Sequence, residues 1–384
     1  MSETLAVGLS TACTAPMQVE RMSFRLYKFL GADSIFLPDH YCSFVPRSVW
    51  GPGLTPAAKV IPTPDAFFDP FVLLGTMAAR SGRVRLGTGV TEPFRRHPAT
   101  LAQAFVTLDH LTKGRAILGI GNGERENTEP YGIPFKRRVG RLEEALTIIR
   151  RLWDSRGEPV DFDGDIWRFK RALFATPLYQ GRAPTVWIAA HAPRMLGLTG
   201  RFGDGWFPTR KMSPEEYRDK LAVIYQAAQA AGRDVSRFEP AFQAQVVVGA
   251  NRARVIADLL KLPAVGAMTM LIPGVIWKAN GLKHPLGDDF EGFPDFVPEE
   301  LTPAQIEDAR RQVTPELLQA GVMAGSVDEI VAEVRPLVDA GLRHLVFWDL
   351  TPLAYGPRPV GMLRLATLLR RLRRLPLAPR LAVR

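Results

Sequence analysis

The sequence predicts an α/β protein, a single (β/α)8 barrel of the TIM type that takes up residues 1–384. Two observations lead to this prediction. Short apolar runs alternate with amphipathic stretches along the whole chain, and there are eight such runs, the number of strands that closes this barrel. The 384 residues exceed the roughly 250 of a typical barrel, so insertions are expected.

The eight apolar runs are expected to form the barrel strands in chain order. They lie at residues 5–10, 34–39, 84–90, 115–123, 185–191, 205–208, 242–249 and 344–350. Helical patterns fall between them at residues 17–30, 70–80, 98–113, 138–153, 214–231 and 327–340, with a short helix from residue 193 and a basic helix at the end. Five prolines make residues 41–64 a long loop. The excess length is assigned to two insertions, residues 155–180 and 265–322.

The composition favours a globular protein of the reducing cytoplasm. An apolar fraction of 46% and a charged fraction of 23% are ordinary for a protein with a sizeable core. No apolar run reaches the ~18 residues of a membrane-spanning helix, and the first residues lack the pattern of a secretory signal. Two cysteines, Cys13 and Cys42, exclude a disulfide framework.

The net charge of +10 is concentrated at the C-terminal end. Residues 362–384 contain seven arginines and no acid, and the last part, residues 370–384, is a basic tail. Such a segment is either a solvated helix face with a frayed end or a peripheral contact with an anionic membrane. A nucleic-acid partner is not expected, because no binding motif accompanies the charge.

Polar, charged and small residues follow several strands at the point where each strand ends. In a parallel barrel these ends lie on one rim, where active sites are built. Small residues there would clear a flat slot for a planar ring, and acids or bases would line its edge. The candidate residues are Asp39, His40, Gly89, Val90, Asn122, Gly123, Glu124, Ala189, Ala190 and His191.

Simpler readings exist for each residue taken alone. A histidine at a strand end is more often structural, and the glycines of 119–123 can serve barrel packing. Their G-x-G-x-G spacing matches neither the dinucleotide fingerprint nor a phosphate loop. The histidines at 97, 110, 191, 284 and 344 are scattered without metal-ligand spacing, so no metal site is predicted.

Several segments resemble the luciferase-like barrel enzymes, and among them the branch that uses the deazaflavin coenzyme F420. The segments are "SIFLPDHYCSF" (34–44), residues 84–124, "VDFDGDIWRFK" (160–170) and "VWIAAHAPRMLGLTGRFGDGW" (186–206). A closer resemblance is to the mycobacterial phthiodiolone and phenolphthiodiolone dimycocerosate ketoreductases. It rests on residues 31–51, on "NGERENTEPYG" (122–132) and on "HPLGDDFEGFPDFVP" (284–298) in the larger insertion.

The resemblance implies an F420-dependent oxidoreductase that reduces a ketone of a long lipid, and a homodimer. It implies that Asp39 and His40 lie near the deazaflavin, that a non-prolyl cis peptide joins Gly89 to Val90, and that Asn122, Gly123 and Glu124 are cofactor and acid positions. Ala189, Ala190 and His191 match a backbone stretch beside the phosphate-bearing side of the cofactor. Phe44 stands where related sugar-phosphate enzymes have Trp, which implies a different substrate chamber.

On this reading His40 or Glu124 donates a proton to the developing alkoxide, and Asp39 orients His40. Five arginines on the loops after the third and fourth strands either meet the anionic tail of the cofactor or are surface charge only. These arginines are Arg95, Arg96, Arg125, Arg137 and Arg138. Three alternatives remain open: an FMN-dependent monooxygenase, an F420-dependent enzyme for another small substrate, and a carrier of cofactor or lipid without turnover.

Overall fold

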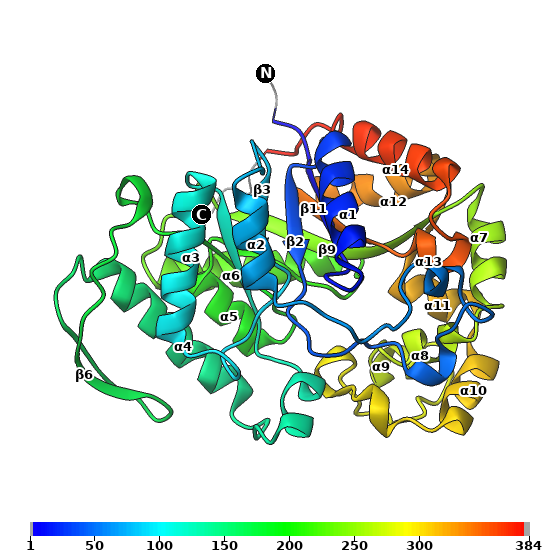
Figure 1. Ribbon diagram of the computed structural model, residues 1–384, viewed down its shortest axis with the longest axis horizontal. Coiled ribbons are helices and arrows are strands. Elements are labelled where there is room, and N and C mark those ends of the chain that lie inside the picture. Colours follow the sequence, from blue (N-terminus) through cyan, green and yellow to red (C-terminus); the bar gives the residue numbers. More distant parts are fainter. Residues whose placement is uncertain (1–2, 380–384) are drawn as a thin grey trace.

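Eight parallel strands close into a barrel in the computed structural model, which describes residues 3–379 (Figure 1). Each strand pairs with the next, and the pairings β1–β11 and β8–β9 close the ring. The strands are β1 (Ala6–Ser10), β2 (Ser34–Leu37), β3 (Arg85–Thr88), β4 (Ala116–Ile120), β7 (Thr185–Ile188), β8 (Gly205–Trp206), β9 (Glu239–Val248) and β11 (His344–Asp349). The predicted (β/α)8 barrel is therefore confirmed, with each strand inside its predicted run or, for β9, beginning three residues earlier.

The barrel strands are buried on both faces, as a sheet covered by helices requires. Their inward side chains fill the barrel, with Phe36, Trp187 and Phe207 in mutual ring contact. Outward side chains such as Leu9 and Ile35 pack against the surrounding helices. A short additional strand, β10 (Met323–Gly325), pairs with the C-terminal end of β9.

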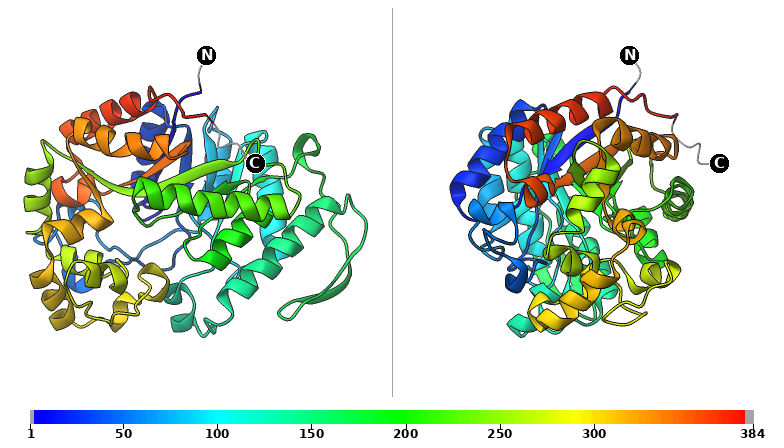
Figure 2. Two further views of the ribbon diagram at one scale, coloured as in Figure 1. Left: turned by 180° about the vertical axis from the view of Figure 1, so that it is seen from behind. Right: turned by 90° about the vertical axis from the view of Figure 1, so that its right-hand side faces the viewer.

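Helices surround the barrel in the order that the sequence predicts (Figure 2). Several begin with proline at their first position, where the missing N–H has no partner to lose. The surrounding helices are α1 (Met17–Phe29), α2 (Pro70–Ala78), α3 (Pro98–Thr112), α4 (Arg138–Asp154), α5 (Pro193–Phe202), α6 (Pro214–Ala230), α12 (Val327–Asp339) and α14 (Pro359–Leu372).

The two segments predicted as insertions have structures of their own. The first holds an antiparallel hairpin, β5 (Val160–Asp163) and β6 (Arg168–Ala172), which extends to the side in Figure 1. The second holds α8 (Ala264–Thr269), α9 (Gly274–Ala279), α10 (Pro303–Gln312) and α11 (Pro315–Gly321). Its core includes Trp277 and Phe296, and it packs on Phe44 from the loop after β2. The larger insertion therefore lies over the C-terminal ends of the barrel strands.

The chain after α14 packs back onto the N-terminal end. Leu372 and Leu375 are buried, and Thr4 forms an isolated bridge with Pro376. Arg371 pairs with Asp328, and Arg373 lies 3.1 Å from Asp33. Of the predicted tail at 370–384, residues 380–384 lie outside the described residues. No helix among residues 3–379 combines the length and apolar character needed to cross a membrane.

Candidate active site

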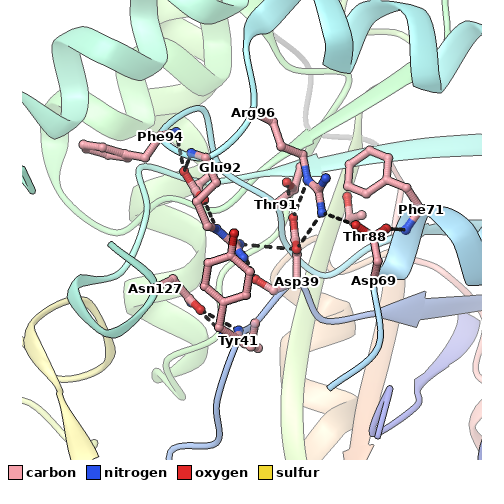
Figure 3. Close-up of polar contacts among 12 residues, drawn as sticks. Asp39, Tyr41, Asp69, Phe71, Thr88, Thr91, Glu92, Phe94, Arg96 and Asn127 are labelled. Atoms are coloured by element: carbon pink, nitrogen blue, oxygen red, sulfur yellow. Dashed lines mark hydrogen bonds and ion pairs between the residues drawn. The ribbon is translucent and has the colours of Figure 1, made fainter. Parts of the chain in front are cut away.

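Asp39, at the end of β2, is held by a cluster of polar partners (Figure 3). Thr91 Oγ1 donates to its carboxylate at 2.6 Å, and Arg96 donates to both carboxylate oxygens at 3.2 Å. The guanidinium of Arg95 lies 3.3 Å away and also pairs with Glu92. Although burial acts to raise it, Arg95 and then Arg96 hold the pKa of Asp39 below its ordinary value. Asp39 is therefore a buried anion that fixes the loop after β3 to the end of β2.

His40 makes its polar contacts through one ring nitrogen. Nδ1 lies 2.9 Å from Glu126 Oε1, 2.9 Å from Asn127 Nδ2 and 3.3 Å from Glu124 Oε2. The Asn127 amide is oriented by the backbone N–H of Tyr41, which donates to its Oδ1 at 2.9 Å. Asn127 Nδ2 forms the hydrogen bond to this nitrogen, and the carboxyl groups of Glu126 and Glu124 lie within ion-pairing distance of it. That leaves Nε2 of the ring for a ligand.

The cluster of His40, Glu124 and Glu126 favours neutral forms. Burial lowers the pKa of His40 and raises the pKa of Glu126 well above its usual range. Burial also raises the pKa of Glu124 to about 7; His40 opposes this shift and Glu126 reinforces it. A carboxyl group that titrates near neutral pH is suited to give or take a proton during a reaction.

The expectation that Asp39 orients His40 is wrong. The Asp39 carboxylate faces Thr91, Arg95 and Arg96, whereas the imidazole is held by Glu126 and Asn127. Adjacent residues at a strand end point in different directions, so sequence adjacency does not bring the two side chains together. Glu126 and Asn127 were not among the site residues predicted from the sequence. Their signal was the pair of acids in "NGEREN" (122–127), whose last three residues, Arg125–Asn127, form a short 3₁₀ turn.

The five arginines assigned to a cofactor tail are occupied by carboxylates of this chain. Arg95 and Arg96 are held by Asp39 as described, and Arg96 also pairs with Asp69 at 3.0 Å. The others face the surface, where their partners are Glu129 and Glu300 for Arg125, Asp165 for Arg137, and Glu291 and Asp295 for Arg138. Arg95 is an interior residue that also stacks over Tyr41, so its predicted role on a cofactor tail is wrong.

A first cavity of about 830 Å³ opens at the C-terminal ends of the strands. Gly121 forms part of its wall, and a Cβ there would meet Val90 at 3.2 Å and Ala189 at 3.6 Å. By contrast, a Cβ at Gly119 would stand 1.9 Å from the Thr88 carbonyl oxygen, so this glycine serves barrel packing. Predicted site residues in the wall are Asp39, Val90, Asn122, Gly123, Glu124, Ala189, Ala190 and His191.

The outer part of this cavity carries cations that sequence reasoning missed. Arg210 and Lys211 line it, following β8 in the chain. His191 Nε2 accepts from the backbone N–H of Thr209 at 3.3 Å, while its Nδ1 is buried without a partner among the described residues. Burial, together with Arg210 and Lys220, lowers the pKa of His191 to about 3, so this ring is neutral.

A second cavity of about 950 Å³ meets the first at its inner end. His40, Phe44 and Gly89 line the second cavity, and Val90 and Glu124 line both. The peptide bond between Gly89 and Val90 is cis, as the resemblance implied. The ring of Phe44 meets the edge of His40 at 4.9 Å and of Phe293 at 4.8 Å between centroids. The ionisable cluster therefore stands where an apolar chamber joins the first cavity.

The same cluster has the spacing of a metal site. One ligand atom each from His40, Glu124 and Glu126 lies within 4.8 Å of the other two. The absence of a metal site stays a prediction. Other histidines have structural partners: His97 caps α3, His284 Nε2 lies 3.0 Å from the Met270 carbonyl oxygen, and His344 Nε2 lies 2.8 Å from Ser34 Oγ.

Comparison with known proteins agrees with this geometry. Residues 18–344 match the family model described as luciferase-like monooxygenase. A phthiodiolone/phenolphthiodiolone dimycocerosates ketoreductase of Mycobacterium tuberculosis is 40% identical over 333 residues, which cover 86% of this chain and 87% of that protein. An F420-dependent glucose-6-phosphate dehydrogenase of Nocardia farcinica is 31% identical over 290 residues, 72% of this chain and 77% of the other.

Solved structures share the fold. An F420-dependent secondary alcohol dehydrogenase, determined with an F420–acetone adduct, superimposes with a TM-score of 0.73 over 96% of this chain and 99% of its own, at 19% identity. The barrel, the cis peptide at its rim and the match of residues 18–344 to the family model are consistent with one another. The chain belongs to the luciferase-like monooxygenase family and is an oxidoreductase.

Proposed function

We propose that this chain is an F420-dependent ketoreductase that adds hydride to the keto carbon of a long-chain lipid and a proton to its oxygen. The observation that carries the proposal is the position of Glu124, which lines both cavities and has a pKa raised to about 7. A proton donor at the junction is what reduction of a carbonyl requires. The names of the mycobacterial and Nocardia relatives support the reaction and the cofactor.

The first cavity fits an elongated cofactor with a flat ring and an anionic chain. Gly121, Val90 and Ala189 offer a wall of small and apolar groups against which a ring can lie. Arg210 and Lys211 bring positive charge to the same cavity, although each also pairs with a carboxylate of this chain, Glu216 and Glu333 respectively. The unpartnered Nδ1 of His191 offers a further polar contact. When bound, F420 supplies hydride as a two-electron carrier. Asn122, Gly123 and Ala190 would complete the contacts with it.

The chain itself handles the proton. Glu124 in its neutral form donates a proton to the oxygen of the substrate as negative charge develops there. His40 stands beside it, and Nε2 of the ring is placed to hold the same oxygen by a hydrogen bond. Glu126 and Asn127 keep the ring in place through Nδ1. Phe44 and Phe293 cover this cluster and keep bulk water away from it.

The test begins with the purified chain and two cofactors. Fluorescence titration should give tight binding of F420 and much weaker binding of FMN. Reduced F420 should then be oxidised in the absence of oxygen when a long-chain methyl ketone is added, with one alcohol formed per cofactor consumed. Preference for FMN, or cofactor oxidation that needs oxygen, would replace this proposal with the monooxygenase alternative.

A further inference from the structure

The second cavity leads from the active site to the protein surface between α1 and α14. Its inner end is lined by His40, Phe44 and Glu124. From there it passes along α1 and α14, which both line the cavity and lie near each other in Figure 1. At the outer end stand Met22 of α1 and Met362 of α14, which are 67% and 38% exposed. The cavity is thus a tunnel with one end at the reacting groups.

The wall of this tunnel is suited to a hydrocarbon chain. Apart from His40, its ionisable side chains are Glu124 at the inner end, Asp349, Tyr27, and two arginines, Arg25 and Arg358. Both arginines are exposed, so positive charge is confined to the mouth. The remainder includes apolar side chains from α1, from the loop after β2 and from the chain after β11. They are Val19 and Leu26; Val45, Trp50, Val60 and Ile61; and Leu353 and Leu365. The lining also includes hydroxyl and amide side chains, such as those of Thr11, Gln243 and Gln245, so the apolar segments are the part of the wall that would hold a hydrocarbon chain.

The mouth of the tunnel also carries exposed apolar side chains. Met22, Val60 and Met362 line the cavity and are at the same time open to solvent. Exposed apolar residues gathered around an opening mark a binding site, in contrast to the single exposed residues that are common on any surface.

We propose that this tunnel binds the alkyl chain of the substrate, which enters between α1 and α14 and brings its keto carbon to the junction beside Glu124 and Val90. The proposal rests on the proposed function for the position of the ketone, and on the tunnel alone for the binding of the chain. Two roles are thereby separated: the first cavity takes the cofactor, and the second selects substrates by chain length. Each methylene that enters the tunnel should tighten binding about fourfold.

One glycine offers a plug for the tunnel. Gly361 lies in the first turn of α14 and lines the cavity, and a Cβ there would meet Thr351 Cγ2 of the opposite wall at an ordinary 3.5 Å. Gly361→Phe should therefore fill the passage without a clash at its first atom. Ser23→Phe, on α1, narrows the same passage from the other side. Gly361→Ala adds one methyl group, and Leu363→Phe adds a ring to an exposed position of the same helix outside the cavity.

The experiment measures binding and turnover for straight-chain methyl ketones from pentanone to heptadecanone. Binding is measured on the protein without cofactor, by displacement of a dansyl-labelled long-chain alcohol. The wild type should bind each longer ketone more tightly until the tunnel is full. Gly361→Phe and Ser23→Phe should lose at least tenfold in affinity for heptadecanone and less than twofold for pentanone, while Gly361→Ala and Leu363→Phe keep the wild-type series.

Two results would separate the tunnel from the proposed function. If both folded plug variants bind the whole series as the wild type does, the chain lies elsewhere and the tunnel proposal is overturned, whatever reaction is catalysed. If the plug variants lose affinity for the long ketones but neither they nor the wild type oxidise reduced F420, the tunnel proposal is upheld and the ketoreductase proposal falls. Turnover that loses its dependence on chain length in the plug variants alone supports both.

Discussion

Nδ1 of His40 lies 2.9 Å from Oε1 of Glu126, a side chain whose exposed fraction is 0%. The two residues follow β2 and β4, which are separated in the barrel by β3. Because water solvates neither group, a neutral imidazole beside a neutral carboxyl group costs less than two separated charges, which agrees with the lowered pKa of His40 and the raised pKa of Glu126. Glu126 is thereby the positioning partner of His40, and it also sets the electrostatic surroundings of Glu124.

Replacing Glu126 by Gln should change the pH dependence of turnover. The amide keeps the shape of the side chain but removes its negative form, which contributes to the raised pKa of Glu124. The alkaline limb of the profile for kcat/KM should therefore move to lower pH, with cofactor affinity unchanged. Glu129→Gln is the matched control, since Glu129 is half exposed and pairs with Arg125. An unshifted limb in Glu126→Gln would show that Glu126 is structural only.

Turnover in the direction of ketone reduction should fall as the pH rises through about 7. Glu124 donates its proton only in the neutral form, and burial raises its pKa to about 7. Below that pH the donor is protonated; above it the rate should drop about tenfold per pH unit. Glu124→Gln should lower kcat by roughly 10²–10⁴ and flatten the profile. A wild-type rate that stays level through neutral pH would assign the proton to another group.

Replacing Asp39 by Asn should destabilise the fold. The change leaves the buried guanidinium of Arg95 with Glu92 as its remaining anion. Breaking a buried ion pair by removing one partner costs about 3–5 kcal/mol, and the remaining pair with Glu92 places the expected loss near the lower end. Urea unfolding measures it. Asp163→Asn, which breaks an exposed pair with Arg168, should change stability by less than about 0.5 kcal/mol.

The same ion pair predicts how stability depends on acid. The pKa of Asp39 is lower in the folded chain than its ordinary value, because Arg95 and Arg96 oppose the effect of burial. Its contribution to stability is complete above the ordinary aspartate pKa of about 3.9 and is lost as the pH falls below that value. Asp39→Asn should therefore narrow the difference in unfolding free energy between neutral and acid pH. An equal acid dependence in wild type and variant would contradict this assignment.

Contact of the basic C-terminal segment with anionic membranes remains a proposal, and the structure makes its test sharper. Deleting residues 370–384 would remove the buried Leu372 and Leu375 and disturb the fold. Reversing the charge of the exposed Arg370 and Arg374 avoids this. If the segment binds phosphatidylserine vesicles, the double Arg→Glu variant should bind at least 25-fold more weakly, at about 1 kcal/mol per arginine. Arg168→Glu, on the distant hairpin, is the control, and equal vesicle binding by all three proteins would exclude the contact.

The sequence by itself determined the barrel, its rim and the residues at each strand end. Eight apolar runs and the prolines that begin helices are local signals, and parallel strands bring their C-terminal ends together whatever the details of packing. For the same reason Asp39, His40, Glu124 and the small residues near Ala189 were expected at one rim, and they line two adjoining cavities there. The resemblance to a known family added the cis peptide at Gly89, which no local pattern predicts.

The tertiary structure alone decided which side chains face one another. Asp39 and His40 are neighbours in sequence, yet one pairs with Arg95 and the other with Glu126, because consecutive residues at a strand end leave the backbone in different directions. The tunnel joins residues from α1, the loop after β2 and α14. Its shape depends on how far two helices stand apart, a distance that side-chain packing sets and that no periodicity in the sequence records.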